Sequence, residues 1–294
     1  MAEKFDVASM IADRLISQME KGEVPWQKPW VGAGRCVARN QKPYSLLNHL
    51  LLGRPGEYIT WKQAEAEGGK IKEGEEKNYS IVVHWTPPRK KSFIKVNDAG
   101  EEEVKEYWKK GALTYFRVYH IDQTEGIVPK YAIMPETHAE PFAEGEQILE
   151  NYIERTGIRL QRDKESDRAY YSPTFDQIVV PKMEQFAHTA EFYSTTFHEM
   201  THSTGHETRL NRLSKEAAFG NEVYSKEELV AEIGAATLCQ HCGISTESSF
   251  QNSAAYLKSW LKALKDDKTM IVSAATLAEK AVKYILNKED KNNG

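Results

Sequence analysis

The sequence has no long hydrophobic run, and none of its apolar stretches approaches the roughly 20 residues that a membrane-spanning helix needs. Its first residues also lack the apolar segment of a secretory signal peptide. Cysteine is scarce, with three residues in 294 at scattered positions, and an odd number argues against a disulfide framework. We therefore expect a cytoplasmic protein that folds without disulfide bonds and has no membrane partner.

Positive charge is also in short supply, because 39 basic residues are outnumbered by 43 acidic ones and the formal net charge is −4. This total argues against nucleic acid as a partner of the whole surface. The two ends differ, however: residues 1–135 carry 21 basic and 18 acidic residues, and the remainder carries 18 and 25. Within 28–62 six basic residues accompany one acid, Glu57, so this stretch is locally basic.

The most informative motif is His198-Glu199-Met200-Thr201-His202, which falls inside a predicted helix over 185–203. Two histidines four residues apart lie on one helical face and can bind one tetrahedral metal ion. Glu199 is placed to act as general base on a metal-bound water. A chance match on a solvated helix is the alternative, but the segment around the motif is largely apolar. We expect Zn²⁺, with Mn²⁺ or another divalent ion able to substitute in vitro.

A third ligand is expected from a second helix that includes residues 225–232. Glu228 and Glu232 lie four residues apart on one face, and the small residue Gly234 follows them. Ser225 and Glu228 could instead form a capping box, which would leave Glu232 as the ligand. We favour Glu228 as ligand and Glu232 as the acid that orients a bound histidine. The residue that would stabilise an oxyanion is not assigned, and the nearby candidates are Tyr193, His206 and Tyr224.

Cys239 and Cys242 form a lone CxxC inside the continuing helix, and we interpret them as packing residues rather than as a metal or redox site. Proline and glycine are frequent over 122–145, which predicts a domain boundary there. We expect domains at 1–135 and 136–288 and a disordered tail at 289–294. Expected helices are 6–20, 48–52, 61–67, 145–157, 255–264 and 269–286; expected strands are 78–86 and 112–121, with a mobile hairpin or loop at 89–110 and a hairpin at 170–181.

Basic and aromatic residues alternate in the first half, as in grooves that hold single-stranded nucleic acid. Cations there would contact phosphates, and aromatic faces would stack on bases. The alternative is that the aromatic residues form the core of a small domain, which composition alone favours. The candidate DNA-binding residues are Lys28, Trp30, Arg35, Arg39, Lys42, Tyr44, Arg54, Trp61 and Lys62.

The order of several motifs resembles the ArdC antirestriction family of plasmids and phages. In the first half these are residues 25–30 (PWQKPW), 44–48 (YSLLN), 58–64 (YITWKQA), 68–75 (GGKIKEGE) and 119–126 (YHIDQTEG). In the second half they are Ser172-Pro173 with Asp176 and Ile178, then 198–205, 209–212 and 227–236.

The resemblance implies an α+β chain, in which a small α/β domain that binds single-stranded DNA precedes a mostly helical, zincin-like metallopeptidase domain with a small sheet. It also implies Glu228 as ligand and Glu232 behind it, although a Glu stands where several such families carry Asp. The expected function is protection of incoming plasmid or phage DNA, by cleavage of an unknown protein substrate. The alternative is a DNA-coating module whose metal site is structural or non-proteolytic.

Overall fold

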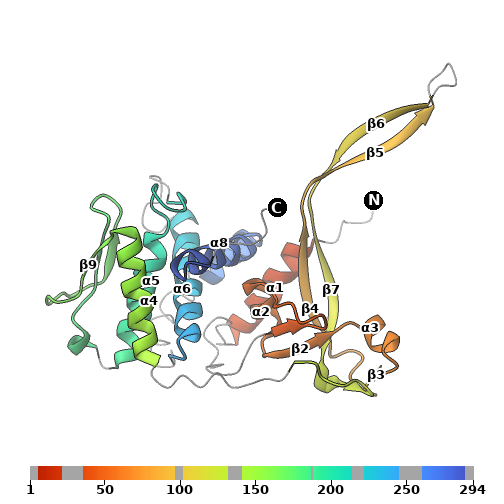
Figure 1. The fold of residues 1–294 in the computed structure, drawn as a ribbon, viewed down its shortest axis with the longest axis horizontal. Helices are drawn as coiled ribbons and strands as arrows, with labels where there is room; N and C mark the ends of the chain where they lie inside the picture. The colour runs from red at the N-terminus through yellow and green to blue at the C-terminus, as the bar shows by residue number, and fades with distance from the viewer. Residues whose placement is uncertain are drawn as a thin grey trace.

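The computed structural model describes residues 6–21, 36–96, 102–131, 141–186, 188–213, 222–244 and 260–288. They form a sheet region that carries a long two-stranded arm, followed by a helical region with a small sheet of its own (Figure 1). This arrangement confirms the predicted α+β fold. Three candidate DNA-binding residues, Lys28, Trp30 and Arg35, lie outside the described residues, as does the predicted tail.

The first region is built on a four-stranded sheet in the order β1-β2-β7-β4. β1 (Cys36–Ala38) runs parallel to β2 (Gly56–Ile59), and β7 (Ala112–His120) lies antiparallel to both β2 and β4 (Ser80–Thr86). α2 (Leu46–Leu52) ends at Gly53, whose φ of 68° suits a residue without a side chain. α3 (Trp61–Ala66) begins with a capping box between Thr60 and Gln63. A short pair, β3 (Lys70–Ile71) with β8 (Thr124–Glu125), completes this region.

Residues 89–110, for which the sequence left a mobile hairpin or a loop open, contain two long paired strands. β5 (Arg89–Val96) and β6 (Glu102–Lys109) pair in register from Arg89 opposite Lys109 to Val96 opposite Glu102. The pair continues from the ends of β4 and β7 and projects away from the rest of the molecule (Figure 1). We call these two strands the arm.

The second region contains α4 (Pro141–Thr156), α5 (Thr189–Ser203), α6 (Glu222–His241) and α8 (Met270–Ile285), with a further helical stretch at 260–266. A small sheet of β9 (Arg159–Gln161), β10 (Tyr170–Ser172) and β11 (Gln177–Val179) has the order β10-β11-β9. α5 begins at Thr189, later than the predicted 185, because a 3-10 turn (Met183–Gln185) precedes it. Cys239 and Cys242 are buried free thiols in the core between α5 and α6, which confirms the packing interpretation.

One of the hydrophobic clusters contains side chains from both regions. α1 (Val7–Glu20) begins at Asp6, whose carboxylate accepts from the Ala8 amide, and it buries Ile11 and Leu15. These side chains pack in the same cluster as Val230 of α6 and Ile271 of α8. Ion pairs support the contact, Lys265 with Glu20 at 2.7 Å and Lys268 with Asp13 at 2.6 Å. The N-terminal helix therefore packs against helices at the far end of the chain.

Among the described helices, none combines the length and the apolar character that crossing a lipid bilayer requires.

Candidate metal centre and nucleic-acid surface

The two motif histidines face each other near the C-terminal end of α5. His198 and His202 have ring centroids 4.7 Å apart, and their Nε2 atoms are separated by 3.1 Å. Glu228 on α6 brings Oε2 to 3.6 Å from Nε2 of His198 and Oε1 to 3.4 Å from Nε2 of His202. One ligand atom from each of the three residues lies within 4.8 Å of the others. Ligand atoms about 2.0–2.2 Å from a tetrahedral ion are separated by such distances, so this donor set fits a divalent metal.

A glycine lets the second helix come close enough to supply Glu228. A Cβ added to Gly234 on α6 would lie 2.6 Å from Cγ2 and 2.7 Å from Oγ1 of Thr201 on α5. Thr201 cannot turn away easily, because it is fully buried and its hydroxyl donates to the Phe197 carbonyl at 2.8 Å. The absence of a side chain at Gly234 thus sets the spacing of the two helices.

The capping alternative for Glu228 is wrong. α6 begins at Glu222, so Ser225 lies inside the helix and cannot be its N-terminal cap. Glu228 is buried, and burial alone would raise its pKa; the contacts with His198 and His202 outweigh that effect and hold its pKa well below the ordinary value. The carboxyl group is therefore ionised, which is the form that binds a metal.

Each histidine has a further carboxylate at its other ring nitrogen. Glu232 lies 3.6 Å from Nδ1 of His198, as the sequence suggested for the acid behind a ligand. Glu227 lies 3.1 Å from Nδ1 of His202, and sequence reasoning missed it. Burial lowers the pKa of His202, but Glu227 and Glu228 raise it to about 10. Such carboxylates orient the imidazole and make it a better donor to a metal.

Glu227 is itself held in place by an arginine from the loop that follows α5. Arg212 donates from Nε to Oε2 at 3.0 Å and from Nη2 to Oε1 at 2.8 Å. Its Nη1 also donates to the Thr204 hydroxyl at 2.6 Å. The sequence did contain a signal for this contact, because Glu227 immediately precedes Glu228. Neighbouring residues of a helix point in different directions, so Glu227 can reach His202 from another side.

Glu199 follows His198 on α5 and is 8% exposed. Of the candidates for oxyanion stabilisation, Tyr193 donates its hydroxyl to Glu146 on α4 at 3.0 Å, and His206 lies 2.8 Å from the Thr208 hydroxyl. These contacts direct both groups to partners other than the histidine pair. The side chain of Tyr224 lies outside the described residues.

The candidate DNA-binding residues have different surroundings. Arg39 is 6% exposed, and its guanidinium pairs with Glu57 and donates to Glu67 at 2.9 Å. It ties β1 to β2 and to the end of α3, so we interpret it as a structural cation rather than a phosphate contact. Arg54 is exposed but pairs with Asp122 at 2.5 Å.

Lys42 and Lys62 are exposed, whereas Trp61 is 39% exposed and donates its indole N–H to Glu65 at 2.7 Å. The Trp61 ring also meets Tyr119 edge-on, with centroids 6.1 Å apart. One part of the Trp61 indole is therefore packed against the protein, and another part is exposed to solvent.

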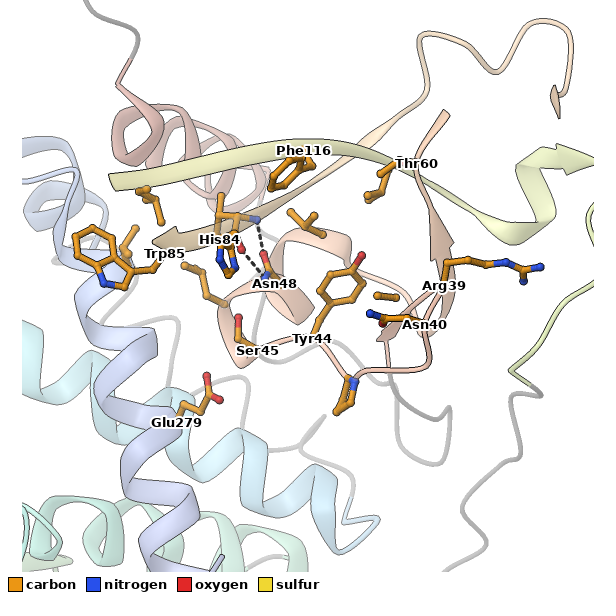
Figure 2. Close-up of a pocket in the computed structure, with 18 of the residues that line it drawn as sticks. Arg39, Asn40, Tyr44, Ser45, Asn48, Thr60, His84, Trp85, Phe116 and Glu279 are labelled. Carbon is orange, nitrogen blue, oxygen red and sulfur yellow. Dashed lines mark hydrogen bonds between the residues drawn. The ribbon is translucent and has the colours of Figure 1, made fainter. Parts of the chain in front are cut away.

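Tyr44 lines a pocket of about 910 Å³ between the sheet and α8 (Figure 2). Phe116 of β7 and Trp85 of β4 line the same pocket, and both side chains are more than half exposed. Asn48 lies at its floor, where its side-chain amide donates to the Val83 carbonyl at 2.9 Å and accepts from the Val83 amide at 2.7 Å. This amide occupies the free edge of β4 and leaves the aromatic side chains around the opening. Sequence reasoning missed Trp85 and Phe116, although both stand in predicted strands.

Comparison with known proteins agrees with this architecture. Residues 5–120 match the family described as the N-terminal domain of anti-restriction factor ArdC, and residues 147–277 match a family of zincin-like metallopeptidases. Crystal structures of the antirestriction ArdC protein from the R388 plasmid superpose with a TM-score of 0.71 at 32% identity. The metal-free form aligns over 97% of this chain and 98% of that one, and the Mn(II)-bound form over 98% and 100%. The chain belongs to the ArdC antirestriction family.

By sequence, two Escherichia coli proteins named DNA primase TraC are similar to this chain. Their identities are 33% and 30%, over 96% and 99% of its length. The chain spans only 27% and 20% of those longer relatives. An uncharacterised Sinorhizobium fredii protein, y4eC, is 26% identical over 95% of this chain and 91% of its own length. In this chain, residues 147–277, which match the zincin-like metallopeptidases, include the histidine pair described above.

Proposed function

We propose that this protein binds single-stranded DNA through its first region and hydrolyses peptide bonds at a zinc site in its second. The observation that carries the peptidase part is the convergence of His198, His202 and Glu228, with Glu199 beside the first histidine. A site that only stabilised the fold would not need a general base there. The Mn(II)-bound ArdC relative supports a divalent ion, and the donor set of two imidazoles and one carboxylate suits Zn²⁺.

His198, His202 and Glu228 would hold the ion, and Glu232 and Glu227 would keep the two imidazoles oriented. A divalent ion supplies a Lewis acid that polarises a peptide carbonyl and acidifies water. Glu199 accepts the proton from the attacking water and returns it to the departing amine. Its near-complete burial keeps bulk water from competing for that proton.

The DNA part rests on the ArdC-type N-terminal domain, on the exposed aromatic side chains around the pocket, and on the TraC relatives, whose name places the same unit within DNA primases. Aromatic faces stack on bases of any sequence, which suits a protein that protects DNA irrespective of sequence. DNA that enters a new host cell as a single strand would be the DNA that this region binds. A DNA-coating role without proteolysis remains the second candidate.

The test separates these two candidates. Purified wild type and Glu199→Gln are compared for metal content and for cleavage of a protein bound to single-stranded DNA. They are also compared for protection of a plasmid that is transferred into a restricting recipient cell. Our proposal expects equal metal content, with cleavage and protection lost in the variant. Equal protection by both proteins, without cleavage by either, would establish the coating role instead.

A further inference from the structure

The root of the arm, where β5 begins and β6 ends, is strongly basic. Among the described side chains of the arm and of the residue that follows it, at 89–92, 104 and 106–110, five are cationic and one, Glu106, is acidic. The cations are Arg89, Lys90, Lys91, Lys109 and Lys110. This concentration stands out in a chain whose net charge is −4.

The pairing register makes this charge unfavourable in the protein alone. Arg89 lies directly opposite Lys109, and like charges at opposed positions destabilise a β-ladder. Glu106 lies 3.0 Å from Lys90, and both side chains are 59% exposed, so this pair offsets only one of the five cations. An anionic partner that lies along the arm root would turn this repulsion into attraction.

Large aromatic side chains are exposed on the arm and on the adjoining strands β4 and β7. Trp108, in register with Lys90, is 65% exposed, Trp85 is 56% exposed and Phe116 is 51% exposed. The two-stranded arm has no interior that could bury Trp108. Because successive side chains alternate between the two faces, Trp85 shares a face with Arg89 and Lys109, and Trp108 lies on the other. Exposed aromatic faces interleaved with cations are the features that single-stranded nucleic acid requires, since bases stack while cations contact phosphates.

Trp85 joins the arm root to the aromatic pocket. It lines the pocket together with Tyr44 and Phe116 (Figure 2), and it stands at the end of β4, just before the arm. A Cβ on Gly111, where the chain leaves the arm for β7, would lie 2.6 Å from Cζ2 of this indole. The missing side chain lets Trp85 lie across the junction, so aromatic surface continues from the pocket to the arm.

We propose that a single DNA strand runs from the Tyr44–Phe116 pocket around the free edge of β4 to Trp85, where a base stacks, and on to the arm root, where Arg89, Lys91 and Lys109 contact its phosphates. This path rests on the proposed DNA binding and gives it a location. The seven residue steps from Phe116 to Lys109 span at most about 23 Å at roughly 3.3 Å per step. A duplex would bury its bases away from the aromatic faces, so the single strand is the favoured form.

The test measures binding of the full chain to a fluorescent oligothymidine and to a duplex of equal length, by anisotropy at several salt concentrations. The double variant Arg89→Gln/Lys109→Gln should flatten the log–log salt dependence by about 1.4, at about 0.7 for each lost phosphate contact. Trp85→Ala should weaken binding roughly 5- to 150-fold, which is the range for loss of one stacked base. Trp85→Phe should retain most of the affinity.

The matched control, Lys77→Gln/Lys164→Gln, removes two exposed cations that lie away from the arm and should leave the salt slope near its wild-type value. Gly111→Ala should weaken binding by displacing Trp85 while leaving every charge in place. Circular dichroism accompanies each variant, and unfolding is not expected because the arm has no core. Unchanged affinity and slope in the arm variants, or a loss confined to duplex, would overturn the path. If wild type itself fails to bind single strands, the proposed DNA-binding function fails instead.

Discussion

Substitution of Gly234 by alanine tests whether the spacing of two helices controls the metal centre. The added Cβ would lie 2.6 Å from Cγ2 of Thr201, whereas carbon atoms in ordinary contact are about 3.5–4.0 Å apart. The hydrogen-bonded Thr201 cannot yield, so α6 must move away from α5 by about 1 Å. Glu228 is on the displaced helix and both histidines are on the other, so the three ligands separate.

Two effects on stability nearly cancel in this variant. Overpacking a core costs about 1–3 kcal/mol, while replacing glycine by alanine inside a helix gains about 1 kcal/mol. The metal-free protein should therefore lose about 0–2 kcal/mol, measured by urea unfolding. Metal affinity should fall by about 10-fold or more, because ligand geometry tolerates displacements of only about 0.5 Å.

Titration against a chelating indicator measures the metal affinity. The control is the double variant Gly234→Ala/Thr201→Ala. Removing Cγ2 and Oγ1 leaves room for the new methyl group, so the double variant should recover most of the affinity. Wild-type affinity in Gly234→Ala would refute the spacing argument. A loss that Thr201→Ala does not relieve would show that the contact with Thr201 is not its cause.

Further predictions concern the ligands and the buried ions. Glu228→Ala should reduce metal affinity more than Glu232→Ala, for which we expect about 10- to 100-fold, and the reverse order by elemental analysis would move the ligand to Glu232. The raised pKa of His202, about 10, keeps this ring protonated in the metal-free protein at neutral pH, so metal affinity should rise with pH. Calorimetry in buffers of different ionisation enthalpy should detect the released proton, and an affinity that falls between pH 6 and 8 would contradict the assignment. Arg39→Met should cost about 3–5 kcal/mol in urea unfolding because it leaves Glu57 buried without its cation, whereas a cost below about 1 kcal/mol would reject the structural role.

Local spacing in the sequence predicted which side chains the structure brings together at the candidate metal centre. His198 and His202 are one helical turn apart in any α-helix, so their shared face followed from the motif alone. Glu228 and Gly234 were identified because small residues after a pair of acids indicate a closely packed helix. The pairing of Glu227 with Arg212 was missed, since it depends on the path of the loop after α5, which no periodicity encodes.

The first region was predicted less well for a physical reason. The composition of a basic, aromatic stretch is the same whether its side chains face solvent or pack against other parts of the protein. Composition therefore cannot tell a DNA-binding residue from a structural one. Arg39 proved to be enclosed by two carboxylates from other elements, and only the fold brings those carboxylates near. The basic root of the arm was overlooked because the acidic residues of 98–103 mask it in any average over the hairpin.

The packing of α1 on the last helices has a consequence for synthesis of the chain. About 260 residues separate α1 from α8, so at roughly 5–20 residues per second the first helix waits about 10–50 s for the surface that covers it. During that interval Ile11, Leu15 and their apolar neighbours are exposed on the nascent chain, where they are natural targets for chaperones. The first region therefore completes its folding only after α8 has been synthesised, and the same region moved into another protein would need the closing helices as well.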